Sequence, residues 1–153
     1  MEIQIAQSEQ EILACFDVMR ELRTDLARDT FVERIRNLNT SGYHLAYAMI
    51  EVAPATETAR AEPVKKVVAV AGFRLGQSLA WKRFLYVDDL ITLGVERSKG
   101  YGRELMQWLK NYAAENNCDQ LHLDSGVQRK DAHRFYEREG MQATSYHFAA
   151  LVK

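Results

Sequence analysis

The sequence predicts a mixed α/β fold, of the α/β or α+β class, in which helices flank the faces of a mixed sheet. Two observations support this class. Segments whose apolar residues recur one helical turn apart alternate along the chain with segments rich in β-branched and aromatic residues. Capping residues and glycines mark the boundaries between these segments. The predicted order of elements is β, α, α, β, β, β, α, β, α, β.

Two helices are predicted after a short strand over residues 2–6. Ser8 and Thr30 each stand three residues before a glutamate, which is the spacing of a capping box at a helix N-terminus. The first helix carries one apolar stripe that we expect to face the core, formed by Ile12, Phe16, Met19 and Leu22. The second helix is expected to end near residues 39–42.

Three longer strands are expected in the middle of the chain. Residues 43–52 and 65–75 are rich in β-branched and aromatic residues. The segment "APATETARAEP" between them has two prolines and no periodicity, so we expect an exposed loop there. Residues 81–95 have the pattern of a longer strand.

The remaining elements alternate between helix and strand. A helix after residue 100 carries an aromatic and apolar stripe, formed by Tyr101, Leu105, Trp108 and Tyr112. A short strand is expected over 120–125 and a helix over 129–139, which Gly140 ends in a left-handed conformation. Residues 141–152 are expected to form the final strand region.

Length and charge restrict the classes of function. The 153 residues predict a single domain over 1–153 that buries its own core. Lysine and arginine number 20 and aspartate and glutamate 21, so a net charge of −1 offers no general attraction to nucleic acid or anionic lipid. We therefore expect no nucleic-acid partner and no membrane partner.

Cysteine usage and hydropathy indicate the compartment. Cys15 and Cys118 lie far apart without metal-binding or CxxC spacing, so we expect two buried thiols, no disulfide framework and no structural zinc site. No segment approaches the roughly 18 apolar residues of a membrane span, and the N-terminus lacks a basic start followed by an apolar run. We expect a cytoplasmic protein.

The segment "RSKGYG" (residues 97–102) places two glycines at the entrance of the helix that follows the third long strand. Glycine lets a ligand approach the main chain closely. A helix N-terminus adds unpaired N–H donors and a partial positive charge, which suit a phosphate or pyrophosphate. Arg97, Lys99 and Arg103 strengthen this interpretation.

Other interpretations of the turn fit the residues less well or remain open. A P-loop needs a lysine and a hydroxyl residue after its second glycine, and neither follows here. A dinucleotide-binding fingerprint needs a third glycine where this chain has Leu105. A turn whose glycines only permit a tight connection between strand and helix remains an alternative.

Two motifs resemble the GNAT superfamily of N-acetyltransferases. "RSKGYG" fits the superfamily signature Arg/Gln-x-x-Gly-x-Gly/Ala, and "DAHRFYEREGM" is similar to its later helix. The element order also resembles the superfamily fold, which implies a mostly antiparallel central sheet. One departure is "TLGVE", where many relatives have Val-x-Pro; Gly94 is expected to leave the strand exit more flexible.

The resemblance implies a site for acetyl-CoA, the acyl donor of this superfamily. The backbones of Ile91 and Thr92 are expected to pair with the pantetheine arm. The amides of residues 97–102 and Arg103 are expected to take the pyrophosphate. The predicted cofactor-binding residues of the turn are Arg97, Ser98, Lys99, Gly100, Tyr101, Gly102 and Arg103.

Acyl transfer to an amine needs a neutral nucleophile and protonation of the leaving thiolate. Tyr136 occupies the position where relatives place a tyrosine near the thioester sulfur, so the resemblance implies a general acid; a packed helix aromatic is the alternative. Asp88 and Asp89 interrupt an apolar strand, and alternation along a strand predicts one carboxylate on each face. Asp88 is the preferred base or amine-orienting group, and Asp89 is the alternative.

The resemblance therefore implies an acetyl-CoA-dependent N-acetyltransferase that acts on a primary amine of a small molecule by direct attack. "RKDAHRFYEREGM" is especially similar to bacterial aminoalkylphosphonate N-acetyltransferases, which suggests a small anionic amine. Acetylation of a protein lysine or N-terminus and a non-catalytic acyl-CoA-binding module are the alternatives. No metal ligand set is predicted. A homodimer is the expected assembly, because the final strand could present an edge to a second chain.

Overall fold

The computed structural model describes residues 1–53 and 63–153. The contacts divide the chain into two compact units, Met1–His122 (unit 1) and Leu123–Lys153 (unit 2). The expected exposed loop over residues 53–63 lies mostly outside the described residues. The single domain over residues 1–153 stays a prediction.

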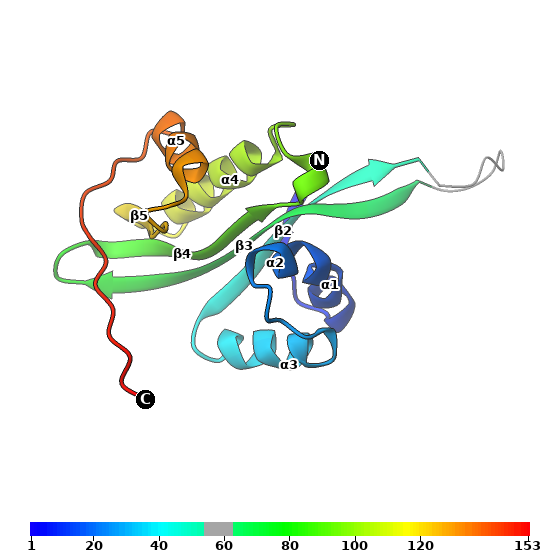
Figure 1. The fold of residues 1–153 in the computed structure, drawn as a ribbon, viewed down its shortest axis with the longest axis horizontal. Helices are drawn as coiled ribbons and strands as arrows, with labels where there is room; N and C mark the ends of the chain where they lie inside the picture. Colours follow the sequence, from blue (N-terminus) through cyan, green and yellow to red (C-terminus); the bar gives the residue numbers. More distant parts are fainter. Residues whose placement is uncertain (54–62) are drawn as a thin grey trace. The chain divides into compact units, whose positions relative to one another are not determined.

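A five-stranded sheet with the order β1-β2-β3-β4-β5 forms the framework of unit 1 (Figure 1). Neighbouring strands from β1 to β4 pair antiparallel. The strands are β1 (Glu2–Ile5), β2 (Tyr43–Val52), β3 (Val64–Ser78), β4 (Lys82–Thr92) and β5 (Gln120–Leu123). The predicted mixed fold with a mostly antiparallel sheet is confirmed.

Helices cover both faces of this sheet. One face, which we call the α1–α3 face, is covered by α1 (Glu9–Ala14), α2 (Phe16–Leu22) and α3 (Arg28–Asn39) (Figure 1). The other face is covered by α4 (Tyr101–Glu115). No helix among the described residues is long and apolar enough to cross a membrane.

The capping box at the start of α1 forms as predicted. The Ser8 hydroxyl accepts a hydrogen bond from the Glu11 N–H at 3.2 Å, and the Glu11 carboxylate accepts one from the Ser8 N–H at 2.8 Å. The single helix expected after it is instead two consecutive helices, because the chain leaves regular helix at Cys15. Burial raises the pKa of the Cys15 thiol to about 12, so this free thiol stays protonated.

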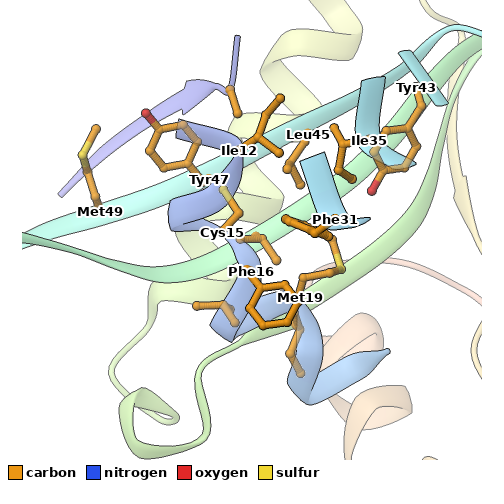
Figure 2. Packing of buried hydrophobic residues seen from close by; sticks show 14 residues of the cluster. Ile12, Cys15, Phe16, Met19, Phe31, Ile35, Tyr43, Leu45, Tyr47 and Met49 are labelled. Carbon is orange, nitrogen blue, oxygen red and sulfur yellow. The ribbon is translucent and has the colours of Figure 1, made fainter. Parts of the chain in front are cut away.

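The main core lies between the α1–α3 face and its helices. Ile12, Phe16 and Met19 from the predicted stripe are buried there against β2 side chains such as Leu45 and Tyr47 (Figure 2). Full burial of such a side chain stabilises the fold by about 1.5–3 kcal/mol. On the opposite face, Phe73 of β3 is buried against the aromatic side chains of α4.

The start of α3 differs from the prediction. The helix begins at Arg28, with Ala27 as its N-cap, so Thr30 lies inside the first turn. The Thr30 hydroxyl donates to the Ala27 carbonyl at 3.4 Å instead of accepting a backbone N–H. The spacing of Thr30 and its glutamate therefore does not form a capping box.

Unit 2 contains α5 (Lys130–Arg138) and a terminal segment. Gly140 has φ 81° just after α5, as predicted for a helix-ending glycine. The predicted final strand does not form, and residues 141–153 have no regular secondary structure. A strand requires a neighbour for its backbone groups, and the alternating sequence pattern does not reveal whether one is present. Several large side chains of this segment are exposed, among them Tyr146, Phe148, Leu151 and Val152.

Candidate active site

The exit from β4 is held by groups from two other elements. The Leu93 N–H donates to the Val68 carbonyl at 2.8 Å. The Gly94 N–H donates to a Glu21 carboxylate oxygen of α2, also at 2.8 Å. Gly94 then begins a short 3₁₀ helix, η1 (Gly94–Glu96). A carboxylate therefore holds the backbone at Gly94, where the sequence predicts a more flexible strand exit.

The "RSKGYG" turn reaches α4 through two left-handed residues, Ser98 with φ 66° and Gly100 with φ 89°. Gly100 is the N-cap of α4, and no side chain caps the helix. The N–H groups of the first turn therefore have no capping acceptor, as an anion-binding helix N-terminus requires. Gly102 lies within the first turn of α4 in helical conformation, so Gly100 is the glycine whose backbone conformation the turn needs.

A buried carboxylate supports the turn from below. Glu96, whose side chain is 9% exposed, accepts hydrogen bonds at 2.7 Å from the ammonium groups of Lys66 and Lys99. Hydrogen bonds from Lys66 and Lys99 lower the pKa of Glu96, which keeps it ionised. Lys99, predicted to bind the cofactor, is thus already paired with Glu96. Glu96 carries no local signal in the sequence, because its partner Lys66 comes from distant β3.

Ile91 and Thr92 pair with Val70 and Ala69 of β3, which occupies one edge of β4. β5 is the neighbour on the other edge and begins beside Arg83, whose carbonyl accepts from the Asp119 N–H at 2.7 Å. A strand of four residues spans only about 13 Å, and β5 therefore ends before the last residues of β4. Because the Leu93 N–H donates to the Val68 carbonyl, alternation along the antiparallel pair also turns the backbone groups of Ile91 towards β3, so Ile91 does not present them on the other edge. The backbone groups of Thr92 face that other edge, beyond the end of β5, as the predicted pairing with the pantetheine arm requires.

The two aspartates of β4 lie on one face of the sheet, because the strand has a bulge at this point. Gly72 pairs with Asp89 and Phe73 with Val87, which leaves Asp88 as the extra residue on β4. The Asp89 side chain lies on the α1–α3 face, because Asp89 pairs with Gly72, which pairs in turn with Leu45 of that face. Asp88 contacts Arg74, whose side chain lies on the same face. The expectation of one carboxylate on each face is wrong for this reason.

Asp89 is enclosed by two donors. The Arg23 Nε lies 2.7 Å from one of its oxygens, and the Tyr43 hydroxyl donates to the other at 2.8 Å. Its side chain is 12% exposed. Burial and the Asp89 charge raise the pKa of Tyr43, so the phenol stays protonated and donates.

Asp88 is more accessible, with its side chain 28% exposed, and is held by Arg74 at 3.1 Å. Burial raises the pKa of Asp88, while the Arg74 guanidinium offsets part of this effect. Arg74 also donates to the carbonyl and hydroxyl of Ser41, each at 3.2 Å. A carboxylate with a raised pKa and access to solvent is suited to proton transfer.

Tyr136 belongs to unit 2 and lies in α5, where its ring contacts Phe135 edge to face at 5.5 Å. Burial raises the pKa of the Tyr136 phenol, and Arg129 offsets part of this effect. The phenol is therefore protonated at neutral pH, the form that a proton donor requires. Within residues 1–53 and 63–153, no group of three histidine, cysteine, aspartate or glutamate residues could hold a metal ion.

Comparison with known proteins identifies the family. Residues 18–141 match the family described as Acetyltransferase (GNAT) family. The chain belongs to the GNAT acetyltransferase family. It is 32% identical over 146 residues to an uncharacterized N-acetyltransferase, YhdJ, of Bacillus subtilis, covering 95% of this chain and 94% of that protein. GNAT acetyltransferases use acetyl-CoA, so this chain is an acetyltransferase enzyme with acetyl-CoA as its donor.

Two further similarities concern parts of the chain or the fold. The GNAT chain is 31% identical to the aminoalkylphosphonate N-acetyltransferase of Salmonella typhimurium over 66 residues, 43% of each protein. Its fold is similar to the aminoglycoside N-acetyltransferase AAC(6')-Iy solved in complex with CoA. The TM-score is 0.72 at 10% identity, covering 99% of both chains.

Proposed function

We propose that this GNAT enzyme transfers an acetyl group from acetyl-CoA to a primary amine of a small molecule by direct attack. The observation that carries the proposal is the Asp88 carboxylate, a partly exposed proton acceptor at the bulge of β4. The partial similarity to an aminoalkylphosphonate N-acetyltransferase supports a small amine with an anionic group as the acceptor.

The residues after β4 suit the donor. The left-handed Gly100 and the uncapped start of α4 supply backbone N–H groups for a pyrophosphate, and Arg97, Lys99 and Arg103 add positive charge. Ser98, Tyr101 and Gly102 contribute backbone groups from the same turn. The edge of β4 beyond β5, where the backbone groups of Thr92 point, would take the pantetheine arm beside Ile91.

Each chemical role then falls to one side chain. Acetyl-CoA supplies a thioester whose carbonyl carbon accepts the amine and whose thiolate leaves. Asp88, directly or through a water, accepts the proton that the amine loses. Tyr136 donates its phenolic proton to the thiolate as it leaves. Asp89 takes no proton in this scheme, because Arg23 and Tyr43 already occupy its oxygens.

A screen of amines with acetyl-CoA, with release of free thiol as the readout, tests this proposal. The panel should contain aminoalkylphosphonates, aminoglycosides, diamines and a lysine-containing peptide. We expect the highest kcat/KM with a small amine. Preference for the peptide would support protein acetylation instead, and no thiol release with any amine would support an acyl-CoA-binding module.

Location and assembly are part of the same proposal. The free thiols of Cys15 and Cys118 suit a reducing compartment, so we infer a cytoplasmic enzyme. We also infer a homodimer, because unit 2 ends in a segment with exposed apolar side chains.

A further inference from the structure

Tyr43 connects the two carboxylates of the β4 bulge, although it lies on a different strand. Its hydroxyl donates to Asp89 at 2.8 Å. Its ring lies under the guanidinium of Arg74, whose central carbon is 5.5 Å from the ring centre. Arg74 in turn holds Asp88 at 3.1 Å. Tyr43 thus contacts Asp89 directly and Asp88 through Arg74.

The glycine opposite Asp89 makes this placement possible. Gly72 pairs with Asp89 across β3 and β4. A Cβ atom at position 72 would overlap the hydroxyl and ring of Tyr43. Tyr43 therefore crosses directly over the backbone of β3 to reach Asp89, and the residue is 2% exposed. An alanine at this position would force the phenol away from the carboxylate.

Arg23 completes the arrangement from the end of α2. Its Nε contacts Asp89 at 2.7 Å, and its Nη2 donates to the backbone carbonyl of Asp88 at 3.1 Å. Asp89 therefore anchors two donors, one of which also fixes the main chain of Asp88. The extra residue of a bulge lacks a partner on the neighbouring strand, so such side contacts determine its orientation.

We infer that Tyr43 is a positioning residue for Asp88, acting through Asp89 and Arg74 and made possible by Gly72. This inference rests on the proposed role of Asp88 as proton acceptor. Tyr43 takes no part in proton transfer. It keeps Arg74 against the Asp88 carboxylate and keeps the bulge in the conformation that presents this carboxylate.

The substitution Tyr43→Phe keeps the ring and removes the hydroxyl that contacts Asp89. The charged groups that face Asp88 are Arg74 from β3, Asp89 from β4 and Arg23 after α2. Without its hydroxyl the ring is no longer tied to Asp89, so we expect the ring, and the Arg74 guanidinium that rests on it, to shift away from Asp88. Because Arg74 lowers the pKa of Asp88, looser contact with Arg74 raises that pKa further. We expect kcat to fall about tenfold at neutral pH, the acid limb of its pH profile to move to higher pH, and KM for acetyl-CoA to stay within about twofold.

Tyr47→Phe is the matched control. Tyr47 lies four residues further along β2, is buried on the same face, and its hydroxyl accepts from Gln4 instead. This variant should keep the wild-type pH profile even if its stability falls. Gly72→Ala should reproduce the profile of Tyr43→Phe by displacing the phenol. A profile for Tyr43→Phe that matches Tyr47→Phe overturns the inference.

A double-mutant cycle separates this inference from the proposed function. If Tyr43 acts through Asp88, then Tyr43→Phe adds little to the loss caused by Asp88→Asn. Fully additive losses overturn the inference while leaving Asp88 in its role. Wild-type turnover of Asp88→Asn overturns the proposed role of Asp88, and with it the positioning role of Tyr43.

Discussion

At the scale of single residues, two neighbouring aspartates have different environments. Asp89 is bound by Arg23 and Tyr43 and is largely buried, whereas Asp88 has one ionic partner and more access to solvent. A carboxylate whose oxygens already accept two strong hydrogen bonds is a poor proton acceptor, since each bond favours its ionised form. This difference favours Asp88 over Asp89 as the proposed base.

Asp88→Asn removes the proton acceptor while keeping the side-chain size. We expect kcat to fall on the order of 10² to 10³. A base must be ionised to act, and the pKa of Asp88 lies above its ordinary value of 3.8. In the wild type, kcat should therefore rise with pH through this raised pKa, and the limb should be absent from Asp88→Asn. Rates measured from acid to neutral pH check this prediction. If the acid limb of the kcat profile persists in Asp88→Asn, a group other than Asp88 causes it.

Tyr136→Phe keeps the contact with Phe135 and removes the phenolic proton. We expect turnover to fall on the order of 10², while acetyl-CoA affinity hardly changes. Steady-state kinetics and calorimetry check the two parts. Turnover within about threefold of the wild type would make Tyr136 a packing residue, and water would then protonate the thiolate.

At the scale of elements, the start of α4 combines a strained turn with a buried support. Gly100 provides the left-handed N-cap, and Glu96 holds Lys66 and Lys99 together beneath it. α2 contributes Glu21 to the same region and is followed directly by Arg23 at the bulge. The end of α2 thus supports both the turn proposed to bind the cofactor and the two carboxylates.

Gly100→Val tests the turn. Positive φ costs a non-glycine residue about 1–3 kcal/mol, most for a β-branched one, so the turn should move out of its conformation. We expect acetyl-CoA affinity by calorimetry to weaken at least about tenfold. Gly140→Val is the matched control, because Gly140 has a similar φ of 81° and equally open surroundings. Equal affinity in both variants would contradict the assignment.

At the scale of the whole molecule, the terminal segment of unit 2 is the most apolar exposed feature among the described residues. Tyr146 and Phe148 are 85% and 90% exposed, and Leu151 and Val152 more than that. Side chains of this size rarely stay in solvent as a contiguous group. The alternation of Tyr146 and Phe148 suits a strand that pairs with another chain.

We expect the protein to be a dimer in light scattering at micromolar concentration. Phe148→Glu should shift it towards the monomer, because a charge in a strand-pairing interface is costly. Leu79→Glu places the same charge at another fully exposed apolar residue, in the turn between β3 and β4, and should leave the dimer intact. A monomeric wild type would contradict the predicted assembly.

The sequence by itself determined the features that depend on neighbours along the chain. Local spacing predicts four such features: the capping box at Ser8, the buried stripe of the first helices, the glycine turn before α4 and the glycine after α5. Each of these depends on residues within about one or two helical turns, so periodicity and turn chemistry suffice for them. The same spacing at Thr30 does not form a capping box, because α3 begins at Arg28. The family resemblance came from the same local motifs.

Only the tertiary structure decided how the candidate site is arranged. The bulge at Asp88 depends on the register between β3 and β4, and it places both carboxylates on one face against the expected alternation. The Glu96 carboxylate is held by Lys66 of β3, and the Asp89 carboxylate by Tyr43 of β2, so both partners come from distant parts of the chain. The unformed final strand has the same cause, since strand pairing joins residues whose separation along the chain no local pattern encodes.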